Sequence, residues 1–261
     1  MSKKAIVVIS FGTSYEEAEK AIVNLENALQ EAFAGYDFYR AFTSGMIIRK
    51  LKRTRGIQIG NPEEVLDFLA EKGYEEVVCQ PTHIINGDEY DKMCRMIGKH
   101  HSSFQSLKVG TPLLTECEDF MRVAPLLSNL APNRKEKEAL VLMGHGSVHF
   151  ANSAYCQMEH VLHYLDYEDV YVGTVEGFPE LDYVMKRLKR QEIKKVYLAP
   201  FMIVAGDHAR NDLAGEEEDS WKSILTKAGY EVEVILKGMG ELKEVARIFV
   251  EHAKKAEEME A

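Results

Sequence analysis

Residues 81–88 read PTHIINGD and residues 200–207 read PFMIVAGD, so two distant stretches share proline, isoleucine, glycine and aspartate at the same spacing. Three more pairs of segments match in the same order along the chain. They are Ile9–Ser14 with Met143–Ser147, Phe42–Gly45 with Thr174–Gly177, and Asn61–Glu63 with Phe178–Glu180. Self-similarity of this kind indicates repeated structural units. The sequence therefore predicts an internal duplication that forms two similar lobes, residues 1–130 and residues 131–261.

The order of the elements predicts the fold of each lobe. Ala5–Ile9 is a continuous apolar run, which is typical of a parallel strand covered on both faces. An amphipathic helix follows, for which we expect Ser14 as the N-cap and Gly35 as the stop. A second helix is expected to begin at Asn61, which precedes a proline, and Glu76–Gln80 is the next apolar strand. This alternation predicts α/β lobes, each built on a doubly wound parallel sheet.

Two segments depart from the simple repeat. Residues 46–60, MIIRKLKRTRGIQIG, have no counterpart in the second half, where the offset between matched segments falls from about 132 to about 117 residues. The inserted segment is either a solvated loop or a clamp whose basic side chains pair with a ligand that carries many carboxylates. The final helix, near residues 240–257, is expected to pack back on the first lobe, and His252 within it to be solvated.

The composition is that of a globular protein, with 46% apolar and 28% charged residues. There are 32 basic and 42 acidic side chains, and the formal net charge of −10 argues against partners such as nucleic acid or an anionic membrane. A strand rather than a signal sequence follows the N-terminus, and the four cysteines form no C-x-x-C pair. We therefore expect a cytoplasmic protein with reduced thiols. A homo-oligomer is compatible with these properties, although no residue specifies its size.

The residues best suited to chemistry lie at strand ends of the second lobe. His145, Glu176 and His208 follow three successive predicted strands, whereas the first lobe has Phe11 and Ser44 at the first two of these positions. The carboxyl ends of parallel strands meet at one edge of a sheet, so the three side chains are expected to converge. Two imidazoles and a carboxylate would bind a divalent first-row metal ion and leave coordination positions open. For each residue alone, the alternative is a hydrogen-bonded structural role.

Other candidate residues leave alternatives open. Glu89 occupies the third position in the first lobe, where it either accepts protons or is an acidic residue in the first turn of a helix. His83 and His149 lie near strand ends and could line a cleft, whereas His160 and His163 are better explained as one face of a helix. The chain has neither G-x-G-x-x-G nor G-x-x-x-x-G-K-[ST], so no nucleotide cofactor is expected.

Five motifs in this chain resemble those of one enzyme family. They are VVISFGTSY at Val7–Tyr15, TSGMIIRKL at Thr43–Leu51, QPTHIINGDEY at Gln80–Tyr90, GHGS at Gly144–Ser147 and PFMIVAGDHA at Pro200–Ala209. With these motifs in this order, residues 4–250 resemble the anaerobic-pathway cobalt chelatases. These are ATP-independent class II chelatases related to ferrochelatase.

The resemblance implies insertion of Co²⁺, as a substrate, into sirohydrochlorin or a related tetrapyrrole during cobalamin biosynthesis. It implies two lobes around a tetrapyrrole cleft, with His145, Glu176 and His208 as the metal residues. Loss of the pyrrole N–H protons needs an acceptor, for which His145 and Glu89 are the candidates. The residues expected to bind the tetrapyrrole all lie in the first lobe, and they are Ser10, Phe11, Gly12, Thr13, Met46, Arg49 and Arg53.

Two other functions remain open on the sequence. The same residues would serve a carrier that binds a metal, haem or another tetrapyrrole without turning it over. A zinc hydrolase would use His145, Glu176 and His208 to hold Zn²⁺ and Glu89 as the base, but the H-E-x-x-H helix of many zinc hydrolases is absent from the sequence.

Overall fold

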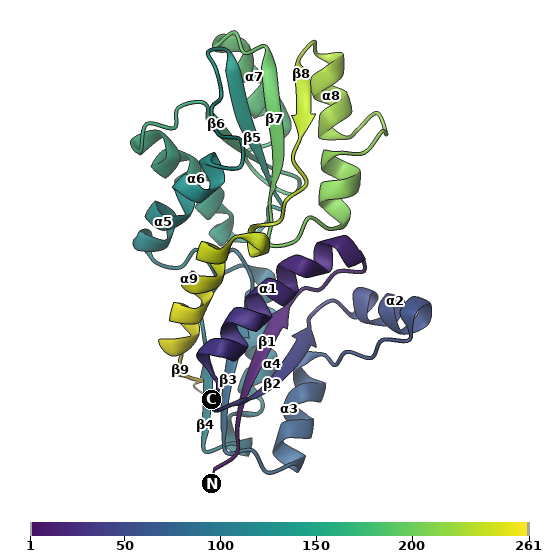
Figure 1. The fold of residues 1–261 in the computed structure, drawn as a ribbon, viewed down its shortest axis with the longest axis vertical. Coiled ribbons are helices and arrows are strands. Elements are labelled where there is room, and N and C mark those ends of the chain that lie inside the picture. Colours follow the sequence, from purple (N-terminus) through teal and green to yellow (C-terminus); the bar gives the residue numbers. More distant parts are fainter. Residues whose placement is uncertain (1, 260–261) are drawn as a thin grey trace. The chain divides into compact units, whose positions relative to one another are not determined.

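The computed structural model describes residues 2–259, which divide into two compact units (Figure 1). One unit holds the chain up to Thr115 together with the segment from Gly240 onward, and the other holds Glu116–Met239. Each unit is a largely parallel sheet with helices on both faces. The predicted α/β class with two similar lobes is confirmed.

The two sheets share one strand order. In the first unit the order is β2 (Asp37–Phe42), β1 (Lys4–Ser10), β3 (Glu76–Pro81), β4 (Ser106–Val109) and β9 (Glu257–Glu258). In the second it is β6 (Val170–Thr174), β5 (Glu138–Gly144), β7 (Lys195–Phe201) and β8 (Glu231–Val234). All pairs are parallel except β4 with β9. Apart from β9, the order matches strand for strand, as a duplication requires.

The helices of the first unit cover a sheet that is apolar on both faces. Helices α1 (Glu16–Ala32) and α9 (Lys243–Lys254) pack on the face that presents Ile6 and Val8 of β1. Helices α3 (Pro62–Glu71) and α4 (Asp88–Gly98) cover the opposite face of the same strand. Successive side chains of a strand point to opposite faces, which is why a continuous apolar run such as β1 needs helices on both.

The second unit repeats this arrangement. Helices α7 (Leu181–Arg190) and α8 (Trp221–Lys227) pack on the face of β5 that presents Val141 and Met143. Helices α5 (Cys117–Ser128) and α6 (Ser153–Tyr164) lie together on the other side of the sheet (Figure 1).

The remaining elements of the two units are α2 (Gly45–Arg55), the short turns His101–Ser103, Phe150–Asn152 and Met239–Glu241, and a π-helix at Ala209–Leu213. No helix among residues 2–259 is both long enough and apolar enough to cross a membrane.

The last helix of each half belongs to the unit formed by the other half. Helix α5 follows β4 but contacts α6, and α9 follows β8 but packs on α1. For this reason the change of unit occurs at Thr115, earlier than the boundary at residue 130 expected from the sequence. His252 of α9 is buried in the first unit, at 7% exposed, and has Nδ1 3.3 Å from the Thr111 carbonyl oxygen. The expectation that His252 is solvated was wrong.

Of the two predicted helix starts, the one at Asn61 is confirmed and the one at Ser14 is wrong. The Asn61 side chain accepts from the Glu64 N–H at 3.0 Å, and the Glu64 carboxylate accepts from the Asn61 N–H at 2.9 Å, which forms a capping box. Helix α1, by contrast, has Tyr15 rather than Ser14 as its N-cap, and it ends at Ala32, before Gly35. The short polar residue at the start of α1 that does bond to the backbone is Thr13, whose hydroxyl accepts from the Tyr15 N–H.

Candidate active site

Two of the predicted metal residues meet at the carboxyl edge of the second sheet. His145 directly follows β5, and His208 precedes the π-helix Ala209–Leu213 that comes after the neighbouring strand β7. Their imidazole rings are perpendicular, with centroids 4.7 Å apart. His145 is exposed and His208 is half-buried, so both rings are accessible to solvent. The structure therefore places two accessible imidazoles side by side.

Glu176 lies beside His145 through the backbone. It follows β6, on the other side of β5, and its N–H donates to the carbonyl oxygen of His145 at 2.7 Å. The Glu176 residue is exposed. Within residues 2–259, no three His, Cys, Asp or Glu side chains are close enough together to hold a metal ion. The structure thus brings the two histidines together, but it does not gather the third predicted ligand with them.

The first unit has the same backbone geometry with different side chains. The Ser44 N–H donates to the carbonyl oxygen of Phe11 at 3.2 Å, as that of Glu176 does to His145. Gly12 and Gly146, the next residues along, both have positive φ, at 97° and 83°. These positions are therefore equivalent in the two units, and only one unit carries metal-binding side chains there.

The His145 loop is joined to the Glu176 loop by close packing and by one amide. A Cβ on Gly146 would lie 2.6 Å from the carbonyl carbon of Glu176, so only glycine fits between the two loops. The Asn152 side chain accepts from the Ser147 N–H at 2.9 Å and donates to the carbonyl oxygen of Phe178 at 2.6 Å. The backbone positions of His145 and Glu176 therefore depend on each other.

Each of the two imidazoles has its Nδ1 atom next to an oxygen acceptor. Nδ1 of His145 is 2.9 Å from the carbonyl oxygen of Gly146, and Nδ1 of His208 is 2.5 Å from Oδ2 of Asp212. A carbonyl and a carboxylate oxygen can only accept, so neutral imidazoles there carry the proton on Nδ1. The lone pair on each Nε2 is then available to bind a metal ion.

Two hydroxyl groups of the expected tetrapyrrole site form hydrogen bonds inside the fold. Ser10 is 2% exposed and its hydroxyl accepts from that of Thr82 at 2.9 Å, while Thr13 is 5% exposed and caps Tyr15. Gly12 is buried, and a Cβ there would collide with the Phe42 ring. Both hydroxyls are thus engaged inside the fold, and tetrapyrrole binding by Ser10, Gly12 and Thr13 stays a prediction.

The other predicted tetrapyrrole residues are exposed. Phe11 is 48% exposed and Met46 is 67% exposed, while Arg49 and Arg53 are exposed on α2. The inserted segment, residues 46–60, is mainly a helix rather than a loop, because α2 extends through Arg55. Ser44 caps its start, and Gly56 ends it with φ at 67°.

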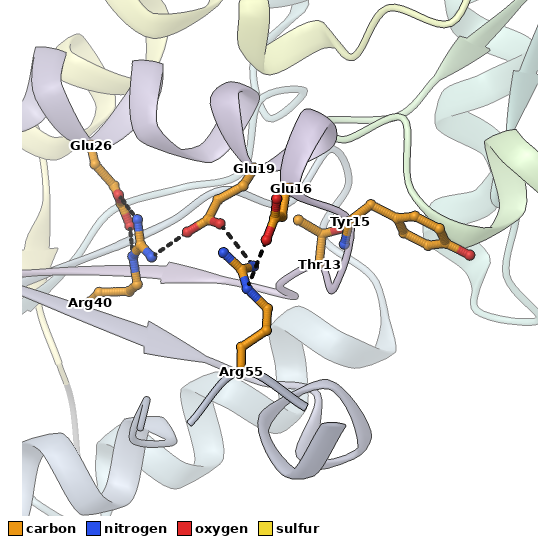
Figure 2. Close-up of polar contacts among 7 residues, drawn as sticks. All are labelled: Thr13, Tyr15, Glu16, Glu19, Glu26, Arg40 and Arg55. Carbon is orange, nitrogen blue, oxygen red and sulfur yellow. Dashed lines mark hydrogen bonds and ion pairs between the residues drawn. The ribbon is translucent and has the colours of Figure 1, made fainter. Parts of the chain in front are cut away.

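One basic residue of the inserted segment is used inside the first unit. Arg55 forms ion pairs with Glu16 and Glu19 of α1, and Arg40 of β2 pairs with Glu19 and Glu26 (Figure 2). These alternating charges hold the C-terminal end of α2 against α1. Arg49 and Arg53 are therefore better candidates than Arg55 for contacts with an acidic ligand.

The remaining candidates serve local structure. Glu89 lies in the first turn of α4 and pairs with Lys92 at 2.8 Å. His149 Nδ1 accepts from the Ala151 N–H at 3.2 Å. His163 Nε2 is 2.9 Å from the carbonyl oxygen of Val170. Glu89 thus occupies the first turn of a helix, which was its structural alternative, and His149 and His163 each contact the backbone nearby.

Burial of the His83 ring makes the stability of the folded protein depend on pH. Both of its ring nitrogens are buried without a hydrogen-bond partner among residues 2–259, and burial lowers the pKa of His83 to about 4, an effect that the Glu89 carboxylate opposes. Histidine in an unfolded chain has a pKa of about 6.5, so between pH 6.5 and pH 4 the unfolded state binds more protons. We expect the free energy of unfolding to fall as pH decreases through this window, by up to roughly 3 kcal/mol from His83.

Urea unfolding of a His83→Gln variant between pH 7 and pH 4 tests this expectation. The variant should lose much of the decrease in stability on acidification, while His101→Gln, which changes an exposed imidazole in the same unit, should retain it. An unchanged pH dependence in His83→Gln would show that His83 does not oppose folding in acid.

Comparison with known proteins identifies the family of this chain. The family model described as cobalt chelatase (CbiK) matches residues 4–258. The sirohydrochlorin cobaltochelatase of Salmonella typhimurium is 41% identical over 97% of this chain and 96% of its own length. The sirohydrochlorin cobaltochelatase CbiKC of Nitratidesulfovibrio vulgaris is 33% identical over 97% of this chain and 90% of its own.

Solved chelatase structures share the fold at low sequence identity. SirB from Bacillus subtilis, solved with Fe³⁺, superposes with a TM-score of 0.66 at 14% identity, covering 97% of this chain and 95% of that chain. CbiX, the terminal enzyme of sirohaem biosynthesis in denitrifying bacteria, has a TM-score of 0.58 at 13% identity, covering 96% and 98%. The resemblance found in the five motifs is confirmed, and the chain belongs to the cobalt chelatase (CbiK) family.

Proposed function

We propose that this chain inserts Co²⁺ into sirohydrochlorin without using a nucleotide. The observation that carries the proposal is the perpendicular pair His145 and His208, each with Nδ1 next to an oxygen acceptor, in a member of the cobalt chelatase family. The names of the two curated relatives support both the metal and the tetrapyrrole. The charge of −10 adds no support for a nucleic acid or anionic membrane partner.

Three residues of the site bind the metal in this proposal. His145 and His208 bind Co²⁺ through Nε2, and the exposed carboxylate of Glu176 joins them from the adjacent loop when the ion arrives. Two imidazoles and one carboxylate leave coordination positions open, so the ion can exchange water for pyrrole nitrogens. A site that is not fully assembled before the ion binds suits a protein that must release the metal to its second substrate.

Metal insertion also releases two protons from the pyrrole nitrogens. His145 is one candidate acceptor, because its Nε2 regains a free lone pair once Co²⁺ has passed to the tetrapyrrole, and a neutral imidazole takes up a proton near cellular pH. Glu89 is the other, and it would have to exchange its ion pair with Lys92 for the incoming proton. The two roles are separable, since only loss of His145 should also weaken binding of Co²⁺ in the absence of tetrapyrrole.

The decisive experiment follows the absorption spectrum of sirohydrochlorin mixed with Co²⁺ and a catalytic amount of the protein. An enzyme converts many equivalents of tetrapyrrole faster than the uncatalysed reaction, whereas a carrier changes the spectrum only in proportion to the protein present. Parallel reactions with Ni²⁺, Fe²⁺ and Zn²⁺ define the preferred metal. Absence of turnover with every metal, together with chelator-sensitive ester hydrolysis, would favour the zinc hydrolase instead.

Helix α2 is proposed to contact the acidic rim of the tetrapyrrole through Arg49 and Arg53. Solvated ion pairs are weak and are screened by salt, at about 1 kcal/mol each or less. The double variant Arg49→Gln and Arg53→Gln should therefore raise the KM for sirohydrochlorin roughly fivefold to tenfold at low salt, and less at high salt. Co²⁺ binding without tetrapyrrole should not change.

A matched control removes the same charge from another helix. Lys186 and Lys189 are exposed on α7, and replacing both with glutamine should leave the KM for sirohydrochlorin within twofold of the original. If the α2 variant has an unaltered KM at low salt, this helix does not bind the rim. If both double variants raise KM equally, overall charge rather than a specific contact attracts the tetrapyrrole.

We also place the protein in the cytoplasm, where thiols stay reduced. All four cysteines are free, and both Cys117 and Cys156 are exposed. Exposed unpaired thiols are better tolerated in a reducing compartment than in an oxidising one.

A further inference from the structure

We infer that Asp212 is a positioning residue that fixes the tautomer and orientation of His208 and thereby strengthens its binding of cobalt. This inference rests on the proposed role of His208 as a metal ligand. It assigns a function to a carboxylate that would not itself touch the metal or the tetrapyrrole.

The contact between the two side chains is direct. Oδ2 of Asp212 lies 2.5 Å from Nδ1 of His208, which is a short distance for an N–H to oxygen hydrogen bond. A carboxylate has no proton to donate at neutral pH, so it requires the proton of His208 to be on Nδ1. The opposite tautomer would place two lone pairs against each other and would leave Nε2 protonated and unable to bind metal.

The backbone around this pair is unusual. His208 immediately precedes the π-helix Ala209–Leu213, and Asp212 lies four residues after it within that helix. π-Helical turns are rare and frequently occur at functional sites. Ala209 and Leu213 are fully buried, so the turn that carries Asp212 is fixed to the core of its unit. The backbone that carries Asp212 is thus anchored by a buried residue on each side, while its side chain is 44% exposed.

The two imidazoles of the site are supported unequally. His145 has a neutral carbonyl, that of Gly146, at its Nδ1, whereas His208 has a charged carboxylate. A carboxylate behind a metal-binding histidine raises the electron density on the other ring nitrogen, and loss of such a partner typically weakens metal affinity about 10–100-fold. The geometry therefore makes His208 the stronger of the two imidazole ligands.

Two measurements on the full chain test this inference. Two-bond ¹H–¹⁵N NMR spectra report the tautomer of each histidine, and titration with Co²⁺ alone reports metal affinity. In the Asp212→Ala variant we expect His208 to lose its preference for the Nδ1–H tautomer, and Co²⁺ to bind about 10–100-fold more weakly. Asp212→Asn, which preserves the shape of the side chain, should fall between that variant and the original protein.

Insertion kinetics separate positioning from a general structural effect. The KM for Co²⁺ should rise in Asp212→Ala, while the KM for sirohydrochlorin stays the same and kcat recovers most of its value at saturating Co²⁺. Asp219→Asn removes the same charge from an exposed position of the same unit and should change none of these quantities. His163, whose Nε2 lies next to a carbonyl oxygen, is an internal NMR reference for the opposite tautomer.

The outcomes distinguish this inference from the proposed function. An unchanged His208 tautomer together with unchanged Co²⁺ affinity in both Asp212 variants overturns the positioning role. A changed tautomer and weaker Co²⁺ binding in a protein that fails to insert cobalt would support the role of Asp212 and overturn the proposed function instead.

Discussion

Replacing either His145 or His208 with alanine should reduce the rate of cobalt insertion by at least about 100-fold, because each change removes a proposed metal ligand rather than one of its supporting partners. Even the loss of a supporting partner typically weakens metal affinity 10–100-fold. The measurement is the initial rate of the absorption change with Co²⁺ and sirohydrochlorin. Thermal unfolding should be nearly unaffected, since neither imidazole belongs to the apolar core.

His160 supplies the matched control for these two variants. It is exposed on α6 of the same unit, and His160→Ala should insert cobalt at the original rate. A near-normal rate in His145→Ala or His208→Ala would remove that residue from the metal site. An equal loss in His160→Ala would show that the effect is not specific to the strand-end histidines.

Gly146→Ala should lower both stability and activity, although it adds only one methyl group. Residue 146 has φ at 83°, and an L-residue in this left-handed conformation costs about 1–2 kcal/mol. The new Cβ would also lie 2.6 Å from the carbonyl carbon of Glu176, so the backbone of the two site loops must separate. Overpacking of this kind typically lowers the free energy of unfolding by about 1–3 kcal/mol more. We expect insertion to fall on the order of 100-fold, because a misplacement of about 1 Å has effects of this size.

Gly229→Ala separates the collision from the backbone strain. Gly229 belongs to the same unit and has φ at 93°, but no atom lies within 4 Å of the position that its Cβ would take. This variant should be destabilised by about 1–2 kcal/mol from strain alone and should retain normal insertion. Chemical denaturation and insertion rates of both variants provide the comparison. If Gly146→Ala behaves like Gly229→Ala, the contact between the His145 and Glu176 loops does not position the site.

Local signals along the chain correctly predicted the elements that depend on short-range chemistry. The strand at Lys4–Ser10 follows from its apolar run, and the capping box at Asn61 follows from a cap residue with Glu64 three positions later. Ser14 failed as a cap because α1 begins at Glu16, so that Tyr15 is the N-cap and Ser14 lies one position before it. Helix ends are the parts of a helix that local sequence determines least well, to within about one or two residues.

The repeat predicted the positions of the site residues better than it predicted the domain boundary. Equivalent strand ends in two similar sheets placed His145, Glu176 and His208 at one edge, since parallel strands direct their carboxyl ends the same way. The boundary depended on which sheet face α5 and α9 cover, and each helix packs in the unit formed by the other half. An amphipathic helix is compatible with any apolar face, so its sequence does not identify its partner.

The sequence by itself determined the fold class, the duplication and the residue types available for chemistry. The fold class depends on patterns within about 20 residues of chain, and the duplication is visible as a match between short segments of the two halves. The tertiary structure decided which of those side chains are free to act. It buried the Ser10 hydroxyl against Thr82, engaged Arg55 with α1, and placed the Asp212 carboxylate behind His208. A polar side chain that leaves water must find a partner, and in two of these three cases that partner lies more than 30 residues away in the sequence. Only packing brings such partners together.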